Sequence, residues 1–241
     1  MSTGRFVWFD LKTTDLAAAR AFYGGLFDWD LQAHGAEYVM ISVGGGACGG
    51  MAAMPAGHPS PSHWIPYVSV DDLAATLDKA RAIGGKVLMQ HRAPGVGEFA
   101  VVADRQGAIL SPIQLEHESP RLPTEKTRNY ICWSELGTSD PADALAFYVD
   151  LFGWKHENHG GYTVLGDEHN AGMADGQPGV PPFWLLYTNV VNADATAAKV
   201  TELGGRVLHG PAEMEGVGRF AVLQDPTGAV FAVMQSAARP A

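Results

Sequence analysis

The feature that most constrains this chain is an internal repeat that spans nearly all of its 241 residues. Phe22–Trp29 begins with Phe-Tyr and ends with Leu-Phe-Asp-Trp, and Phe147–Trp154 begins with Phe-Tyr and ends with Leu-Phe-Gly-Trp at the same spacing. Gly95–Val101 likewise matches Gly216–Val222 at six of seven positions. Matches in the same order along the chain predict two copies of one domain in tandem.

The copies are bounded by a short segment of different composition. Residues 118–128 contain two prolines and several charged side chains, which is typical of a linker. We therefore predict domain one over residues 1–117, a linker over 118–128 and domain two over 129–241. These domains are called copy one and copy two below.

Each copy shows the same predicted order of helices and strands. Asp15 follows the first apolar strand and is a helix N-cap signal, and Gly84-Gly85 is typical of the end of a second helix. The expected elements of copy one are strands over 5–12, 38–43, 48–54, 64–70, 86–89, 98–103 and 108–115, and helices over 16–26 and 72–83. The order strand, helix, strands thus occurs twice per copy.

Composition limits the possible partners and compartment. The formal net charge of -10 is spread over both halves, which argues against nucleic acid or an anionic membrane and is compatible with a cationic ligand. Two cysteines support neither a disulfide framework nor a cysteine zinc site. Without a signal-peptide pattern or a membrane-spanning run, a cytoplasmic protein is the expectation.

Three conspicuous motifs have ordinary interpretations. Gly44-Gly45-Gly46 and the two Gly-Val-Gly stretches lie between predicted strands, so we interpret them as hairpin turns and not as phosphate-binding loops. His156–His159 reads His-Glu-Asn-His, which has the wrong spacing for a zinc-binding helix and favours a solvated loop. The Phe22-Tyr23 and Phe147-Tyr148 pairs are predicted to lie in the core.

Two motifs mark each copy. The first is a strand followed by Thr-Asp and by a helix that ends in the Phe-Tyr and Leu-Phe-Gly-Trp pattern, and the second is Asp-Pro-x-Gly before a final strand. With these motifs the chain resembles the vicinal-oxygen-chelate superfamily. The last motif stands at Asp225–Gly228 and, degraded, at Asp104–Gly107. The resemblance to these glyoxalase, bleomycin-resistance and extradiol-dioxygenase proteins implies an α+β fold. Each domain would hold two βαβββ modules in a U-shaped, mostly antiparallel sheet with helices outside. The chain also resembles bacterial two-domain "hydroxylase" or glyoxalase-like proteins.

In metal-dependent members, the resemblance implies a cup in which His, His and Glu side chains hold a divalent ion. Two neighbouring oxygen atoms of the substrate chelate the ion, which acts as a Lewis acid or activates molecular oxygen. Transferred to this chain, the ligand positions fall on residues that are poor donors for such an ion. They are Trp8, Ile65 and Ser111 in copy one, and Trp133, Leu185 and Ala232 in copy two. We therefore predict no metal at the usual sites.

Strand alternation predicts what lines the cups instead, because residues two apart share a face. Asp10 and Glu135 are the candidate catalytic residues, each as a hydrogen-bond acceptor or general base. The candidate ligand-binding residues are Trp8, His63, Tyr67, Trp133, Tyr187 and Asn189. The alternatives are that Trp8 and Trp133 fill collapsed cups, and that the two carboxylates are surface or ion-pair groups. A further hypothesis is that Asp10 and His63, each one strand dyad from a usual ligand position, hold a divalent metal in copy one only.

Three functions remain open at this stage. The first is an enzyme that acts on a small, aromatic organic molecule without the metal triad, as a hydroxylase or isomerase. The second is a bleomycin-resistance-type protein that binds a drug or metabolite without catalysis. The third is a duplication with no small ligand. We expect a small-molecule partner, and either a monomer whose copies form an internal pseudo-dimer or a homodimer.

Overall fold

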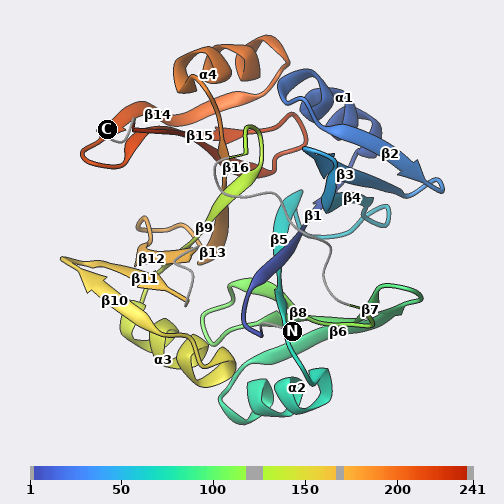
Figure 1. Cartoon of the computed structure of the whole chain (residues 1–241), viewed down its shortest axis with the longest axis vertical. Coiled ribbons are helices and arrows are strands. Elements are labelled where there is room, and N and C mark those ends of the chain that lie inside the picture. Colours follow the sequence, from blue (N-terminus) through green and yellow to red (C-terminus); the bar gives the residue numbers. More distant parts are fainter. Residues whose placement is uncertain (1–2, 118–126, 167–170, 238–241) are drawn as a thin grey trace. The chain divides into compact units, whose positions relative to one another are not determined.

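A computed structural model describes residues 3–117, 127–166 and 171–237. Residues 118–126, which make up most of the predicted linker, lie outside the described residues. Both copies follow the predicted order of strand, helix and strands twice over (Figure 1).

Copy one contains eight strands and two helices. They are β1 (Phe6–Thr13), α1 (Leu16–Leu26), β2 (Asp30–His34), β3 (Tyr38–Val43), β4 (Gly46–Ala53), β5 (His63–Ser69), α2 (Leu73–Ala82), β6 (Lys86–Ala93), β7 (Gly97–Ala103) and β8 (Ile109–Leu115). The prediction missed β2 and made β6 four residues too short. β2 has only two apolar residues, Leu31 and Ala33, and every residue except Leu31 is exposed, so its apolar signal is weak.

Copy two repeats this arrangement. Its elements are β9 (Ile131–Thr138), α3 (Pro141–Phe152), β10 (His156–His159), β11 (Tyr162–Leu165), β12 (Ala171–Asp175), β13 (Phe183–Asn189), α4 (Ala193–Glu202), β14 (Arg206–Met214), β15 (Gly218–Gln224) and β16 (Val230–Ser236). The prediction of a loop at His156–His159 was wrong, because these residues form β10 and pair with β11. Their side chains are exposed, as expected.

The strands form two mixed sheets of eight strands each. Their orders are β2-β3-β4-β1-β5-β8-β7-β6 and β10-β11-β12-β9-β13-β16-β15-β14. Within each module the first and last strands are parallel, and the hairpin pairs are antiparallel. This confirms the expected α+β class, with two tandem copies that each hold two four-stranded modules with a helix.

The chain divides into two compact units, each of which takes segments from both copies. Unit 1 comprises Met1–Trp8, Ile65–Pro120 and Ser134–Leu185, and unit 2 comprises Phe9–Trp64, Arg121–Trp133 and Leu186–Ala241. In unit 1, Arg105 of copy one forms an ion pair of 2.8 Å with Asp143 of copy two. Segments of the two copies therefore pack together within a unit, while the domain boundaries and the oligomeric state stay predictions.

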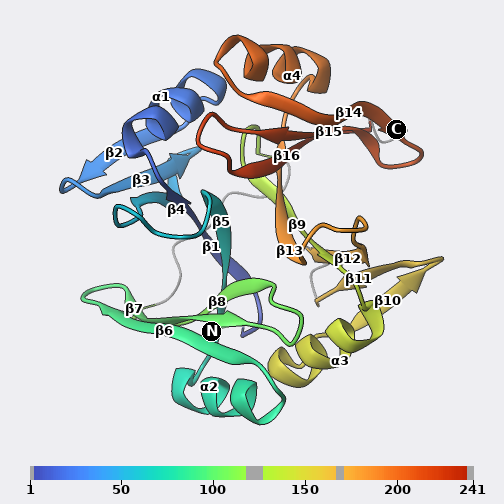
Figure 2. The same ribbon diagram turned by 180° about the vertical axis from the view of Figure 1, so that it is seen from behind.

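The helices begin where the sequence places their caps. Asp15, Asp72, Asp140 and Asn192 each accept a hydrogen bond from the backbone N–H three residues further on. Helix α2 packs on β6–β8 and α4 on β14–β16, as the view from behind also shows (Figure 2). Each helix thus covers strands of its own module.

Each unit buries a chain of polar groups around the predicted core tyrosine. In unit 1, Trp184 Nε1 donates to the Tyr148 hydroxyl, which donates to Asp104 Oδ2 at 3.0 Å. In unit 2, Trp64 Nε1 donates to the Tyr23 hydroxyl at 3.1 Å. Burial, followed by the charge of Asp104, raises the pKa of Tyr148 well above its usual value. These fully buried tyrosines belong to the core, as predicted.

The glycine stretches are turns, as predicted. Gly44 and Gly45 have φ values of 58° and 83° between antiparallel strands β3 and β4, a conformation that glycine adopts without strain. Gly95 has φ 79° between β6 and β7. Cys48 and Cys132 are free thiols.

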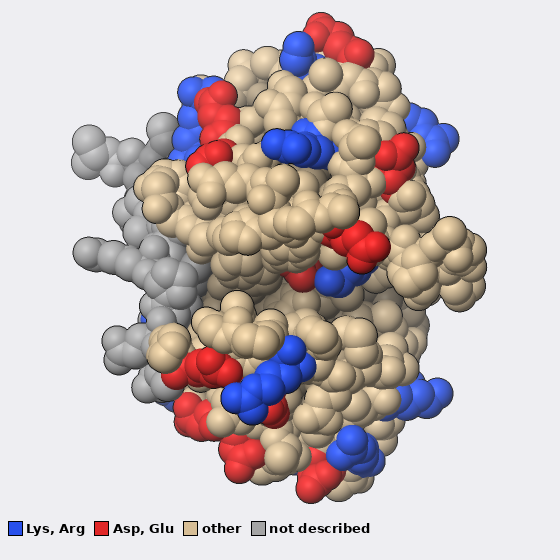
Figure 3. All heavy atoms as spheres, turned by 90° about the vertical axis from the view of Figure 1, so that its right-hand side faces the viewer, with Lys and Arg blue, Asp and Glu red and all other residues tan. Residues whose placement is uncertain are grey.

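Charges are mixed on the surface shown in Figure 3. Lys and Arg groups there lie scattered among Asp and Glu groups, without a continuous basic area on the described residues of that face. Within the described ranges, no helix is long and apolar enough to cross a membrane. The face in view therefore lacks the basic surface that nucleic acid requires.

Candidate ligand-binding site

The six positions at which the resemblance places metal ligands carry side chains that do not fit a divalent ion. Ile65, Leu185 and Ala232 are buried and have no donor atom. The Ser111 hydroxyl is also buried and donates to the carbonyl oxygen of Ala100 at 2.6 Å. A neutral hydroxyl already used in this way is a poor ligand.

The alternative metal hypothesis at Asp10 and His63 gains no support from the geometry. Asp10 is engaged through both carboxylate oxygens, and His63 Nδ1 lies 2.8 Å from the carbonyl oxygen of Pro61. Burial lowers the pKa of His63, so its ring is neutral at pH 7. No group of three His, Cys, Asp or Glu residues able to hold a metal occurs in the described part of the chain. A metal here would therefore have to share the carboxylate oxygens of Asp10 with Lys12 and Tyr38.

The carboxylate of copy one lies in unit 2, where a lysine and a tyrosine contact it. Lys12, two residues further along β1, places its Nζ atom 3.0 Å from Asp10 Oδ2. The Tyr38 hydroxyl on β3 donates to Asp10 Oδ1, also at 3.0 Å. Tyr38 reaches the carboxylate across Gly50, where a Cβ atom would overlap the hydroxyl. Glycine at this point of β4 is therefore required by the close approach of the ring.

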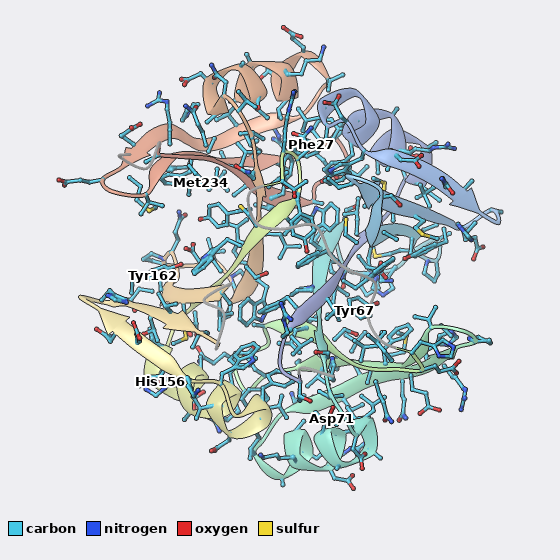
Figure 4. All side chains as sticks on the ribbon, viewed as in Figure 1. Phe27, Tyr67, Asp71, His156, Tyr162 and Met234 are labelled. Carbon is cyan, nitrogen blue, oxygen red and sulfur yellow. The ribbon has the colours of Figure 1, made fainter. Side chains whose placement is uncertain are left out.

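Copy two repeats this arrangement in unit 1 with two differences, of which the first is Glu135 in place of Asp10. The Tyr162 hydroxyl, on β11, donates to Glu135 Oε2 at 3.0 Å, and the tyrosine ring crosses Gly172, where a Cβ atom would again overlap it. Tyr162 is labelled in Figure 4. Register is conserved between the copies, since Asp10 pairs with Gly50 and Glu135 with Gly172. The position of Lys12, however, is taken by Gly137.

The predicted aromatic ligand residues lie beside further rings. In unit 1, Tyr67 is 5.4 Å from Phe99 between ring centroids, and Phe99 is 5.5 Å from His91. In unit 2, the equivalent Phe220 is 5.5 Å from His209. Tyr67 and Tyr187 are buried, whereas Phe99 and Phe220 are half-buried. Each copy thus presents rings at equivalent strand positions.

The remaining predicted residues have more varied surroundings. Trp8 and Trp133 are half-buried. Asn189 Nδ2 donates to the carbonyl oxygen of Thr127 at 3.4 Å, and the Asn189 backbone pairs with Asn129 and Tyr130. Asn189 therefore holds the segment before β9 in place through hydrogen bonds, and this structural role adds to its predicted role in ligand binding.

Sequence reasoning missed Tyr38 and Tyr162, which hold the two candidate carboxylates. A signal was present, because each tyrosine begins the strand before the one that carries Gly50 or Gly172. It also missed Tyr148 as the partner of Asp104, although both belong to the quoted family pattern.

Comparisons with known proteins agree with this geometry. A model of the Glyoxalase/Bleomycin resistance protein/Dioxygenase superfamily matches residues 129–233, and a model of a glyoxalase-like domain matches residues 7–110. The chain is 39% identical over 246 residues to "Putative glyoxylase CFP32" of Mycobacterium tuberculosis, which covers 95% of this chain and 94% of that protein. It is 33% identical over 123 residues to "Anthracycline biosynthesis protein DnrV" of Streptomyces peucetius, over 42% of this chain and 45% of that protein.

Solved structures show the same fold. The Mn(II)-bound glyoxalase from Novosphingobium aromaticivorans has a TM-score of 0.68 at 15% identity, over 97% of this chain and 82% of that chain. The 2,2',3-trihydroxybiphenyl 1,2-dioxygenase from Sphingomonas wittichii strain RW1 has a TM-score of 0.70 at 13% identity, over 98% and 91%. The two family models and the relative that is 39% identical show that the chain belongs to the glyoxalase, bleomycin-resistance and dioxygenase superfamily.

Proposed function

We propose that the protein binds a small, planar aromatic molecule without using the metal triad of its superfamily. The observation that carries the proposal is the identity of the six ligand positions. Five of the six positions carry tryptophan, isoleucine, leucine or alanine, which provide apolar contacts where metal-dependent relatives need donor atoms. At the sixth position, the Ser111 hydroxyl is buried and donates a hydrogen bond to the carbonyl oxygen of Ala100.

The surrounding side chains support an aromatic ligand. Rings at Tyr67, Phe99 and His91 lie within 5.5 Å of their neighbours in unit 1, and Phe220 and His209 repeat part of this cluster in unit 2. Rings at such separations offer edges and faces to a further ring, and stacking contributes about 0.5–1.5 kcal/mol per pair. The relatives named for anthracycline biosynthesis are consistent with a polycyclic aromatic ligand.

Calorimetric titration with a dihydroxyanthraquinone tests the proposal. Trp8→Leu and Trp133→Leu form a matched pair, because they remove the same ring from equivalent positions of the two copies. We expect at least one of them to weaken binding about three- to tenfold, as the loss of one stacking pair predicts. Unchanged binding in both variants, or no binding by the parent, would contradict the proposal.

Two further measurements complete the test. Elemental analysis should find no stoichiometric divalent metal held by the usual positions. One metal per copy, lost on changing Ser111 or Ala232, would overturn this, and a metal lost only on changing Asp10 or His63 would support the alternative site. Turnover of the bound molecule would identify a hydroxylase- or isomerase-like enzyme, with Asp10 or Glu135 as the candidate base. Saturable binding without turnover would identify a binding protein.

A further inference from the structure

A groove lies between α1 and the hairpin of β2 and β3 in copy one, and all of its lining belongs to unit 2. Helix α1 lies beside this hairpin in both ribbon views (Figures 1 and 2). The groove has a volume of about 780 Å³, which is within the range of small-molecule sites. Its lining is alanine, glycine, leucine, valine and tryptophan, with Arg20 as the one charged residue among the described residues that form it. We propose that this groove binds an elongated apolar molecule through its chain and one carboxylate of that molecule through Arg20.

The helix wall of the groove consists of small residues. Ala17, Ala21 and Gly24 share one face of α1, because they follow one another at intervals of four and three residues, and all three are exposed. Glycine is less favourable than alanine inside a helix, so Gly24 requires a packing or functional reason. A Cβ atom on Gly24 would lie 3.3 Å from Leu31 Cδ1 on the opposite wall. A larger side chain here would therefore narrow the groove.

Arg20 is fixed at the groove by one hydrogen bond and keeps further donors for a ligand. Its Nη2 atom donates to the carbonyl oxygen of Leu31 at 3.1 Å, which links α1 to β2. A guanidinium group carries five N–H donors, and among the described residues no carboxylate forms an ion pair with Arg20. The group is exposed, so the remaining donors can bind a carboxylate with two parallel hydrogen bonds.

The equivalent groove of copy two has a different character. It lies between α3 and the hairpin of β10 and β11, within unit 1, and has a volume of about 660 Å³. Its lining includes three ionisable residues, which are Lys155, His156 and Glu157. Copy two has Leu145 at the position of Arg20 and Val149 at the position of Gly24. The combination of an apolar groove with a single cation therefore belongs to copy one.

The net charge of -10 does not prevent an anion from binding at this point. Interactions between exposed charges are largely screened beyond about 10 Å at 0.1 M salt. Arg20 acts on a carboxylate at hydrogen-bond distance, where screening is weakest. The apolar chain adds affinity by leaving water, and this contribution does not depend on the charge of the protein.

Fluorine NMR titration with 8-fluorooctanoate, compared with 8-fluorooctan-1-ol, tests the site at about 0.1 M salt. The two probes have the same chain and differ in charge. We expect the parent to bind the carboxylate about two- to fivefold more tightly than the alcohol, which is the range of an exposed charge pair. Arg20→Gln should abolish this preference, and Arg20→Lys should keep part of it. Gly24→Val, which introduces the residue of copy two, should weaken the binding of both probes about threefold or more.

Arg206→Gln is the matched control, because Arg206 is also exposed and donates to a neutral acceptor, Gln224 Oε1, at 2.8 Å. It should keep the full preference. Equal binding of the two probes by the parent, or an unchanged preference in Arg20→Gln, would overturn the proposal. A loss in Arg206→Gln as large as in Arg20→Gln would also overturn it, since net charge alone would then explain the effect. Unchanged affinities in a Gly24→Val variant that circular dichroism shows to be folded would place the probes outside the groove.

Discussion

The carboxylate sites of the two copies share a framework and differ in two residues. In both, a tyrosine hydroxyl lies 3.0 Å from the carboxylate, and its ring crosses a glycine of the last strand of the module. Copy one has a buried aspartate with the half-buried Lys12 beside it, whereas copy two has a half-buried glutamate and Gly137. The duplicated scaffold is therefore kept in both copies, while the carboxylate residue and the residue two positions further along the strand differ.

The largest expected effect concerns the shared framework. Gly50→Ala and Gly172→Ala each place a Cβ atom on a tyrosine hydroxyl, so the ring must move and the bond to the carboxylate is lost. We expect each change to lower the free energy of unfolding by about 1–3 kcal/mol. Urea denaturation measures this, and Gly137→Ala, where the nearest atom is 3.8 Å away, is the control with a change below about 0.5 kcal/mol. Destabilisation by only one of the two alanine substitutions would contradict the claim that both copies share this framework.

A smaller effect is the difference between the contributions of the two carboxylate sites to the free energy of unfolding. Lys12→Met leaves Asp10 charged at a site where its side chain is 6% exposed, so we expect a loss of about 1–2 kcal/mol in the free energy of unfolding. Glu135→Gln should change it by less than about 0.5 kcal/mol, because the residue is half-buried and keeps an acceptor for Tyr162. The double variant Asp10→Asn with Lys12→Met should recover part of the loss. Equal effects of Lys12→Met and Glu135→Gln would remove the distinction between the copies.

The smallest effect is the pH dependence of copy one. Burial, and to a lesser degree Lys12, lower the pKa of His63, while the bond to the carbonyl of Pro61 opposes the shift. Because the folded-state pKa lies below the unfolded value near 6.5, this contribution to stability is present above pH 6.5 and is lost as pH falls through the folded-state pKa. Copy two has Phe183 at the equivalent position.

His63→Phe therefore makes copy one resemble copy two. It should reduce the decrease in unfolding free energy between pH 7.5 and pH 5 by less than about 1 kcal/mol. Denaturation at the two pH values measures the difference. A steeper decrease in the variant than in the parent would show that the sign is wrong.

The sequence predicted the repeat, the caps and the turns because these depend on local residue types. Asp15 caps a helix and Gly95 adopts positive φ whatever lies across the sheet. It did not predict that Tyr38 and Tyr162 bind the carboxylates, because that contact depends on the register of three neighbouring strands. The pairing of Asp10 with Lys12 was within reach, since residues two apart on a strand share a face. The strand β2 is harder to predict, because Leu31 and Ala33 are its only apolar residues and the strand is mostly exposed.

The most direct test of the account is calorimetric titration with a dihydroxyanthraquinone before and after the protein is treated with a divalent-metal chelator. If the protein binds the aromatic molecule without the metal triad of its superfamily, the affinity should be the same in both samples, and Trp8→Leu or Trp133→Leu should weaken it about three- to tenfold. Loss of binding after chelation, with recovery when a divalent metal is added back, would contradict the account.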